Sequence, residues 1–168
     1  MRVPAVLISP KNKLGLQTTK LFESSDDAKE WRLEIDLPPT GSERTAFVKV
    51  SPILSVPSEI IEVRYKVPFG LNVEPKKSLA VCTKDGEGGE KVGDVLRYTS
   101  QWTLGLPEGE GLASSAAAFS GGLSWTCTLF DVMKAKAWEQ VVEALVSNVQ
   151  DKTDEVVLLF ERPLEGTA

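Results

Sequence analysis

Residues 64 to 73 read Arg64-Tyr65-Lys66-Val67-Pro68-Phe69-Gly70-Leu71-Asn72-Val73, and this stretch decides how the rest of the chain is interpreted. Residues 62 to 67 favour an extended strand, Pro68 lacks a backbone donor, and Gly70 allows a tight turn before a second strand begins at Leu71. A turn of this kind leaves backbone N–H groups pointing outward. Such groups can hold a carboxylate while an extended peptide adds to the open edge of the neighbouring strand.

Three downstream segments extend this pattern. Gly93-Asp94 precedes a strand-like run, and residues 155 to 162 form a second β-prone run that Pro163 ends. Between them, apolar residues three and four apart predict a helix from about Lys134 to Val149. We expect this helix to direct Trp138, Val142 and Leu145 at the sheet.

The stretch resembles the carboxylate-binding loop of PDZ domains, in which a basic residue and three spacers precede any residue, an apolar residue, Gly and an apolar residue. Arg64 and residues 68 to 71 fit this pattern. Gly93-Asp94 resembles the start of the fourth PDZ strand, and residues 138 to 145 resemble the second helix, which walls the peptide groove. The resemblance implies that residues 58 to 163 form an α+β, mainly β domain, a PDZ-like and partly open barrel of five or six strands capped by one main helix.

The resemblance also implies a binding mechanism, in which a partner's end adds as a strand between residues 71 to 74 and the helix. The N–H groups of the loop would meet the terminal carboxylate, a water would link it to the arginine, and the helix would set side-chain preference. The implied peptide- and carboxylate-binding residues are Arg64, Phe69, Gly70, Leu71, Asn72, Val73, Trp138 and Val142. PDZ domains often have His where this chain has Trp138. An alternative is that Trp138 fills the groove and the domain is a rigid block in an assembly.

Two segments depart from the PDZ pattern. The acidic turn at residues 85 to 90 leaves no room for the short first helix of PDZ domains. Residues 103 to 122 are rich in Gly, Ala and Ser and form an insertion that we expect to be a loop. Residues 164 to 168 are a tail.

Residues 1 to 57 are expected to form an extended arm, because repeated prolines interrupt them. Alternation of polar and apolar residues predicts a short hairpin within residues 29 to 50. The arm's apolar side chains either pack on the body or bind a partner, and we favour the partner. The candidate docking residues are Leu7, Ile8, Leu14, Leu16, Leu21, Phe22 and Trp31.

Composition limits the functions that the chain can have. The net charge is −5 over 168 residues, which argues against a nucleic-acid partner, and no apolar run approaches a membrane span. The chain has no His, and Cys82 and Cys127 do not form a CxxC motif, so we expect no metal, no cofactor and no catalytic activity. The cysteines are expected to be reduced and buried.

Residues 98 to 102, the insertion and residues 156 to 163 together resemble the single-PDZ proteins of algal and plant chloroplasts. This implies a stromal scaffold subunit attached to a thylakoid photosystem or light-harvesting assembly, without a transmembrane segment. The basic residues 1 to 22 have the composition of a transit peptide or of a docking extension, and we favour docking. The alternative function is a soluble PDZ adapter that captures partner C-termini in signalling or protease regulation.

Overall fold

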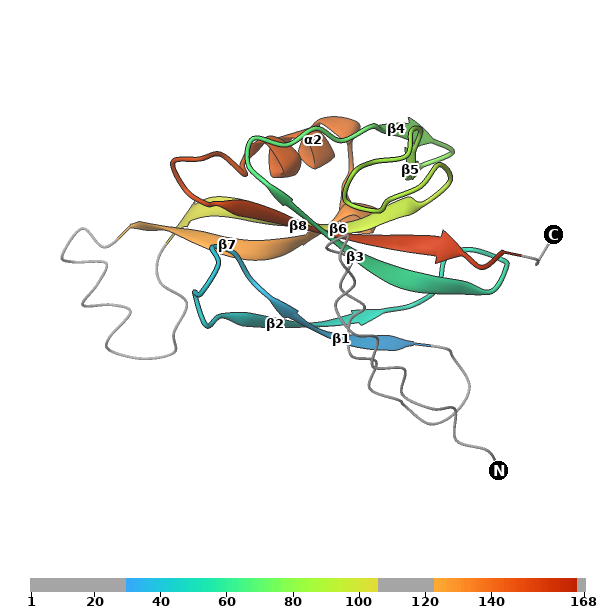
Figure 1. Cartoon of the computed structure of the whole chain (residues 1–168), viewed down its shortest axis with the longest axis horizontal. Coiled ribbons are helices and arrows are strands. Elements are labelled where there is room, and N and C mark those ends of the chain that lie inside the picture. The colour runs from blue at the N-terminus through green and yellow to red at the C-terminus, as the bar shows by residue number, and fades with distance from the viewer. Residues whose placement is uncertain (1–29, 106–122, 166–168) are drawn as a thin grey trace, which may run out of the picture.

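The computed structural model describes residues 30 to 105 and 123 to 165 (Figure 1). In these residues the fold is mainly β, with one α-helix and one 3-10 turn. The elements are β1 (Trp31–Asp36), β2 (Thr45–Val50), β3 (Ser58–Lys66), β4 (Val73–Lys76), β5 (Leu79–Cys82), β6 (Val95–Gly105), β7 (Ser124–Asp131), η1 (Val132–Lys134), α2 (Trp138–Val146) and β8 (Glu155–Pro163). The predicted α+β, mainly β class is confirmed.

Six strands form one antiparallel sheet in the order β3-β8-β6-β5-β4, and β7 pairs with β6. This sheet does not close into a barrel, and β3 and β4 are the two ends of its strand order. The remaining strands, β1 and β2, pair with each other in the interval where the sequence predicts a hairpin. No helix of the described residues is long and apolar enough to cross a membrane.

Strand β8 lies between β3 and β6 and supplies side chains to both faces of the sheet. Val156, Leu158 and Phe160 join the cluster on the α2 side, whereas Val157 and Leu159 join the cluster on the hairpin side. All five side chains are fully buried. This double burial explains why the sequence of β8 is a continuous apolar run rather than an alternating one.

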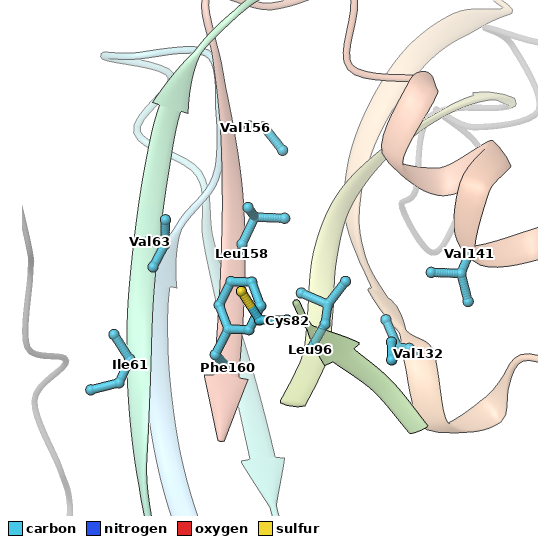
Figure 2. Close-up of a cluster of buried hydrophobic side chains, with 10 residues drawn as sticks. Ile61, Val63, Cys82, Leu96, Val132, Val141, Val156, Leu158 and Phe160 are labelled. Carbon is cyan, nitrogen blue, oxygen red and sulfur yellow. The ribbon is translucent and has the colours of Figure 1, made fainter. Parts of the chain in front are cut away.

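The cluster on the α2 side gathers side chains from β3, β5, β6, β8, η1 and the helix (Figure 2). Val141 and Ala144 are the buried residues of α2, and Trp138 and Leu145 pack against the same cluster while partly exposed. Val142 is 40% exposed, so the prediction that it points at the sheet is wrong. The buried face is centred on the small Ala144, which contributes little to the apolar pattern of the sequence.

Helix α2 is shorter than the predicted span of residues 134 to 149. Ala137 has extended backbone angles and precedes the helix, so Lys134 belongs to the separate turn η1. At the other end, the side-chain NH2 group of Asn148 donates to the carbonyl oxygens of Ala144 at 3.1 Å and of Ser100 at 2.8 Å. Asn148 therefore ends the helix and fixes its end to β6.

The β1–β2 hairpin covers the opposite face of the sheet from α2 (Figure 1). Its inward residues contact residues of β3 and β8; this cluster contains Trp31, Leu33, Ile35, Val50, Ile60, Val157 and Leu159. Trp31 is 2% exposed, so its assignment to a partner-docking arm is wrong. The other candidate docking residues, Leu7, Ile8, Leu14, Leu16, Leu21 and Phe22, lie outside the described residues.

A buried carboxylate fastens the link between the hairpin and β3. Glu161 on β8 accepts hydrogen bonds from the N–H groups of Ile53 and Leu54 at 3.1 and 3.0 Å and from the Ser58 hydroxyl at 2.9 Å. Glu161 also pairs with Arg97, which is itself buried. Its charge and lone pairs are thus satisfied inside the protein, as buried carboxylates require.

The acidic turn contains no helix, as the sequence predicts. Its conformation is held by Tyr65, whose hydroxyl accepts from the N–H of Gly88 at 2.7 Å and donates to Glu90 at 2.5 Å. A Cβ at Gly88 would lie 2.5 Å from a methyl carbon of Val63. The close approach of the turn to β3 therefore requires glycine at this position.

Candidate peptide-binding groove

The N-terminal end of helix α2 lies at the β4–β5 turn (Figure 1). At that end a hollow of about 200 Å³ is lined by Pro75 and Leu79 on one side and by Trp138 and Val141 on the other. Past the other end of the helix, the Gln150 side chain donates to the carbonyl oxygen of Val67 at 3.4 Å. We call the strip between this hollow and the loop of residues 67 to 72 the candidate groove, because the resemblance places a peptide there.

Along β4, the backbone N–H and C=O groups of successive residues point alternately toward β5 and toward the groove. Lys77 and Ser78 form a two-residue turn with φ values of 49° and 65°, typical of a type I′ hairpin. The N–H of Thr83 donates to the carbonyl oxygen of Asn72 at 2.9 Å, so the backbone groups of Asn72 point toward β5. Because pairing alternates along an antiparallel ladder, Val73 and Pro75 turn their backbone groups away from β5.

The open edge of β4 is therefore short. None of the hydrogen bonds among residues 30 to 105 and 123 to 165 uses the outward backbone groups of Val73. Pro75 offers an outward carbonyl but has no N–H. A strand added to this edge could form both backbone hydrogen bonds with Val73, but with Pro75 it could only donate to the carbonyl oxygen.

The loop that closes the groove carries unused donors. In the part of the chain that the structure describes, no hydrogen bond uses the N–H of Phe69, Gly70 or Leu71. The side chains of Phe69 and Leu71 pack against the core, and the Phe69 ring stacks on Tyr65 with centroids 6.2 Å apart. Gly70 is exposed, and a Cβ there would have no heavy atom within 4 Å, so the fold itself does not require glycine at this position.

The helix presents one apolar flank next to its buried face. Val142 and Val146 are 40% and 63% exposed and lie four and eight residues after Trp138 on the helix. Trp138 is half-buried and lines the hollow, so the hollow stays open beside it. Trp138 also packs against the core cluster on the α2 side, so the alternative in which it fills the groove stays a prediction beside the peptide-binding one.

Arg64 does not belong to the groove, and its predicted role in carboxylate binding is wrong. Its guanidinium donates to Glu62 at 2.6 Å, to Glu155 at 2.6 Å and to the carbonyl oxygen of Asp36 at 2.7 Å. Burial alone would lower the pKa of Arg64, but the two carboxylates raise it above its usual value. Arg64 thus joins the hairpin to β3 and β8 on the face opposite α2.

The cysteines are poorly suited to thiolate chemistry. Burial raises the pKa of the Cys127 thiol to about 11 and also raises the pKa of Cys82. Both are free and buried. Among the described residues, no group of three or more His, Cys, Asp or Glu is placed to hold a metal ion.

Sequence reasoning missed the lysines at the open end of the groove. Lys76 and Lys77 lie on the β4–β5 turn, and Lys136 lines the hollow just before α2. All three are exposed. The signal was present in the sequence, since Lys76-Lys77 follows the predicted second strand and Lys136 precedes Trp138.

Of the predicted peptide-binding residues, Trp138 lines the hollow. Phe69, Gly70, Leu71 and Asn72 belong to the loop before β4, Val73 begins β4, and Val142 is exposed on α2, so their joint role in peptide binding stays a prediction. The chemistry of the candidate groove is that of backbone pairing, with donors at one end and apolar side chains along the helix. No family model, curated protein or solved structure matches the chain.

Proposed function

We propose that the chain is a non-catalytic, PDZ-like interaction module that binds the C-terminal end of a partner protein as an added strand between β4 and α2. One observation carries this proposal: an unpaired strand edge runs into a loop with three unused N–H groups. A terminal carboxylate and an extended backbone are together the ligand that such an arrangement accepts.

In this mechanism, the partner's carboxylate accepts hydrogen bonds from Phe69, Gly70 and Leu71. Hydrogen bonds to a charged group contribute about 1.5 to 3 kcal/mol each, so the loop supplies a large part of the affinity. The next backbone groups of the partner pair with Val73, and its apolar side chains lie against the exposed Val142 of the helix flank. This mechanism needs no positively charged side chain at the carboxylate, so it is compatible with the position of Arg64 on the other face of the sheet.

The order of elements supports the PDZ-like assignment. Strand β3 leads into the loop, β4 follows it, Gly93-Asp94 comes directly before β6, and α2 precedes the closing strand β8. Strand β8 pairs with β3 and so brings both ends of the predicted domain together.

The test is peptide binding to the full chain, followed by fluorescence polarisation. Peptides with an apolar last residue and a free carboxylate should bind, and the same peptides with an amidated end should bind at least about tenfold more weakly, because the loop loses its charged acceptor. Gly70→Val should block binding without loss of stability, since the added side chain meets open space. Phe47→Ser, on the exposed side of the hairpin, is the matched control. Equal binding of free and amidated peptides, or no binding of either, would refute the proposal.

The cellular setting that we propose follows from the chloroplast resemblance alone: a stromal-side peripheral subunit of a photosystem or light-harvesting assembly, to which residues 1 to 29 attach it. Trp31 and the rest of the hairpin belong to the core, so the informative deletion ends before β1. Removing residues 1 to 29 should release the protein from thylakoid complexes purified in mild detergent, while Gly70→Val should not. Retention of the deleted protein together with release of the Gly70 variant would place the attachment in the groove.

A further inference from the structure

Positive charge gathers at one end of the groove. Its open end carries Lys76 and Lys77 on the β4–β5 turn and Lys136 before the helix, all exposed. None of these lysines forms an ion pair with a described residue. Glu139 in the first turn of α2 offsets part of this charge. Residues 58 to 168 carry 11 Lys and Arg against 17 Asp and Glu, so a lysine cluster here is a local feature of an acidic body.

The direction of an added strand is fixed by the proposed function, on which this inference rests. With its carboxylate at the loop of residues 67 to 72, a partner pairs antiparallel to β4, and its earlier residues run toward the turn. Lys76 lies four residues after Asn72 in the sequence. Since antiparallel strands advance one residue for one residue, the lysines face partner positions about four to six residues before the carboxylate.

Backbone pairing cannot hold those earlier positions. Pro75 has no N–H to donate, so the ladder between the partner and β4 ends before it reaches Lys76. Side chains must then provide whatever contact remains at this end of the groove. Three exposed ammonium groups favour carboxylates, and their effect on binding decreases with salt.

From this we infer that the module selects partner C-termini that carry acidic side chains about four to six residues before the terminal carboxylate. The apolar last residue provides the anchor in the groove, and the acidic residues distinguish the correct partner from other chains with the same end. Charge complementarity of this kind acts mainly on specificity and on the association rate.

The test uses three fluorescent peptides with an identical apolar end and a free carboxylate, whose upstream positions are all Asp, all Ser or all Lys. At low salt, the Asp peptide should bind the full chain about tenfold more tightly than the Ser peptide, and high salt should remove this difference. In the triple variant Lys76→Glu, Lys77→Glu and Lys136→Glu, the order should reverse in favour of the Lys peptide. The matched control is Lys49→Glu, Lys84→Glu and Lys91→Glu, which makes the same charge change at exposed sites outside the groove.

The outcomes separate this inference from the proposed function. If the three peptides bind equally and amidation still weakens each of them, the groove binds C-termini without charge selection, and the inference is wrong. If the control triple variant changes the peptide order as much as the groove variant does, the selection comes from the overall charge, and the inference is also wrong. If no free-carboxylate peptide binds, both proposals fail.

Discussion

The carboxylate of Glu161 is fully buried and has four partners, which are the N–H groups of two loop residues, one hydroxyl and one guanidinium. Removing one member of a buried ion pair leaves the other charge without compensation. We therefore expect Glu161→Ala to lower the free energy of unfolding by about 3 to 5 kcal/mol. Urea denaturation checks this value, with the exposed Glu139→Ala as the control that should stay within about 0.5 kcal/mol of wild type. A loss below about 1 kcal/mol would mean that water replaces the carboxylate.

The two tyrosines provide a test of the structure by titration. Burial, then the hydrogen bond to Glu90, raises the pKa of Tyr65 to about 12, and burial, then the charge of Asp131, raises the pKa of Tyr98 to about 12. The folded pKa values exceed the unfolded value of about 10, so this contribution to stability is complete below pH 10 and is lost as the pH rises toward 12. The phenolate absorbance of the native protein should therefore increase only near pH 12, and that of the denatured protein near pH 10. A native transition near 10 would show that one hydroxyl is solvated, and Tyr65→Phe and Tyr98→Phe would identify it.

At the scale of single elements, the β1–β2 hairpin is part of the domain core rather than of an arm. Trp31→Ala should lower the free energy of unfolding by about 3 to 5 kcal/mol, because a large buried side chain leaves a cavity between the hairpin and the sheet. Phe47→Ala, on the outer side of the same hairpin, should have little effect, since Phe47 is 81% exposed. Thermal or urea unfolding of both variants measures the difference. Equal stability of the two variants would contradict the packing of the hairpin on β3 and β8.

Sequence patterns predicted the strands better than the helix. The alternation of Trp31, Leu33 and Ile35 gave the hairpin, and a continuous apolar run gave β8, because strand periodicity is visible over a few residues. The predicted helix began four residues too early, because Lys134 belongs to η1 and Ala137 is extended. The apolar spacing that predicted the helix continues through Ala135 and so does not show this break.

The candidate site was predicted in part for a similar reason. The loop and the helix flank were found from local sequence, but Arg64 was assigned to the wrong face. In a strand, side chains alternate, so Arg64 lies on the side of Ile60 and Glu62, whereas Tyr65 lies on the side of α2. The alternation of side chains along the strand would have corrected this assignment. That Arg64 pairs with Glu155 could be found only from the folded structure.

At the scale of the whole molecule, the sheet separates a face covered by the hairpin from a face that carries α2 and the proposed binding site. The hairpin and its connections cover one face, and α2 with the groove covers the other (Figure 1). Groove variants such as Gly70→Val and hairpin variants such as Trp31→Ala share no contacts, so their effects on stability should add. This separation is what allows binding and folding to be tested by different substitutions.

The central place of β8 has a consequence for synthesis on the ribosome. Strand β8 follows all the other described strands in sequence, yet it supplies side chains to both cores and pairs with β3 and β6. Neither core can close while residues 155 to 163 remain in the exit tunnel, so we expect folding to wait for their emergence. Stalled nascent chains should stay sensitive to protease until a linker lets β8 leave the tunnel, and resistance before that point would contradict this expectation. For as long as β8 is withheld, the apolar strands before it are exposed, and a chaperone that binds extended apolar segments would find its substrate there.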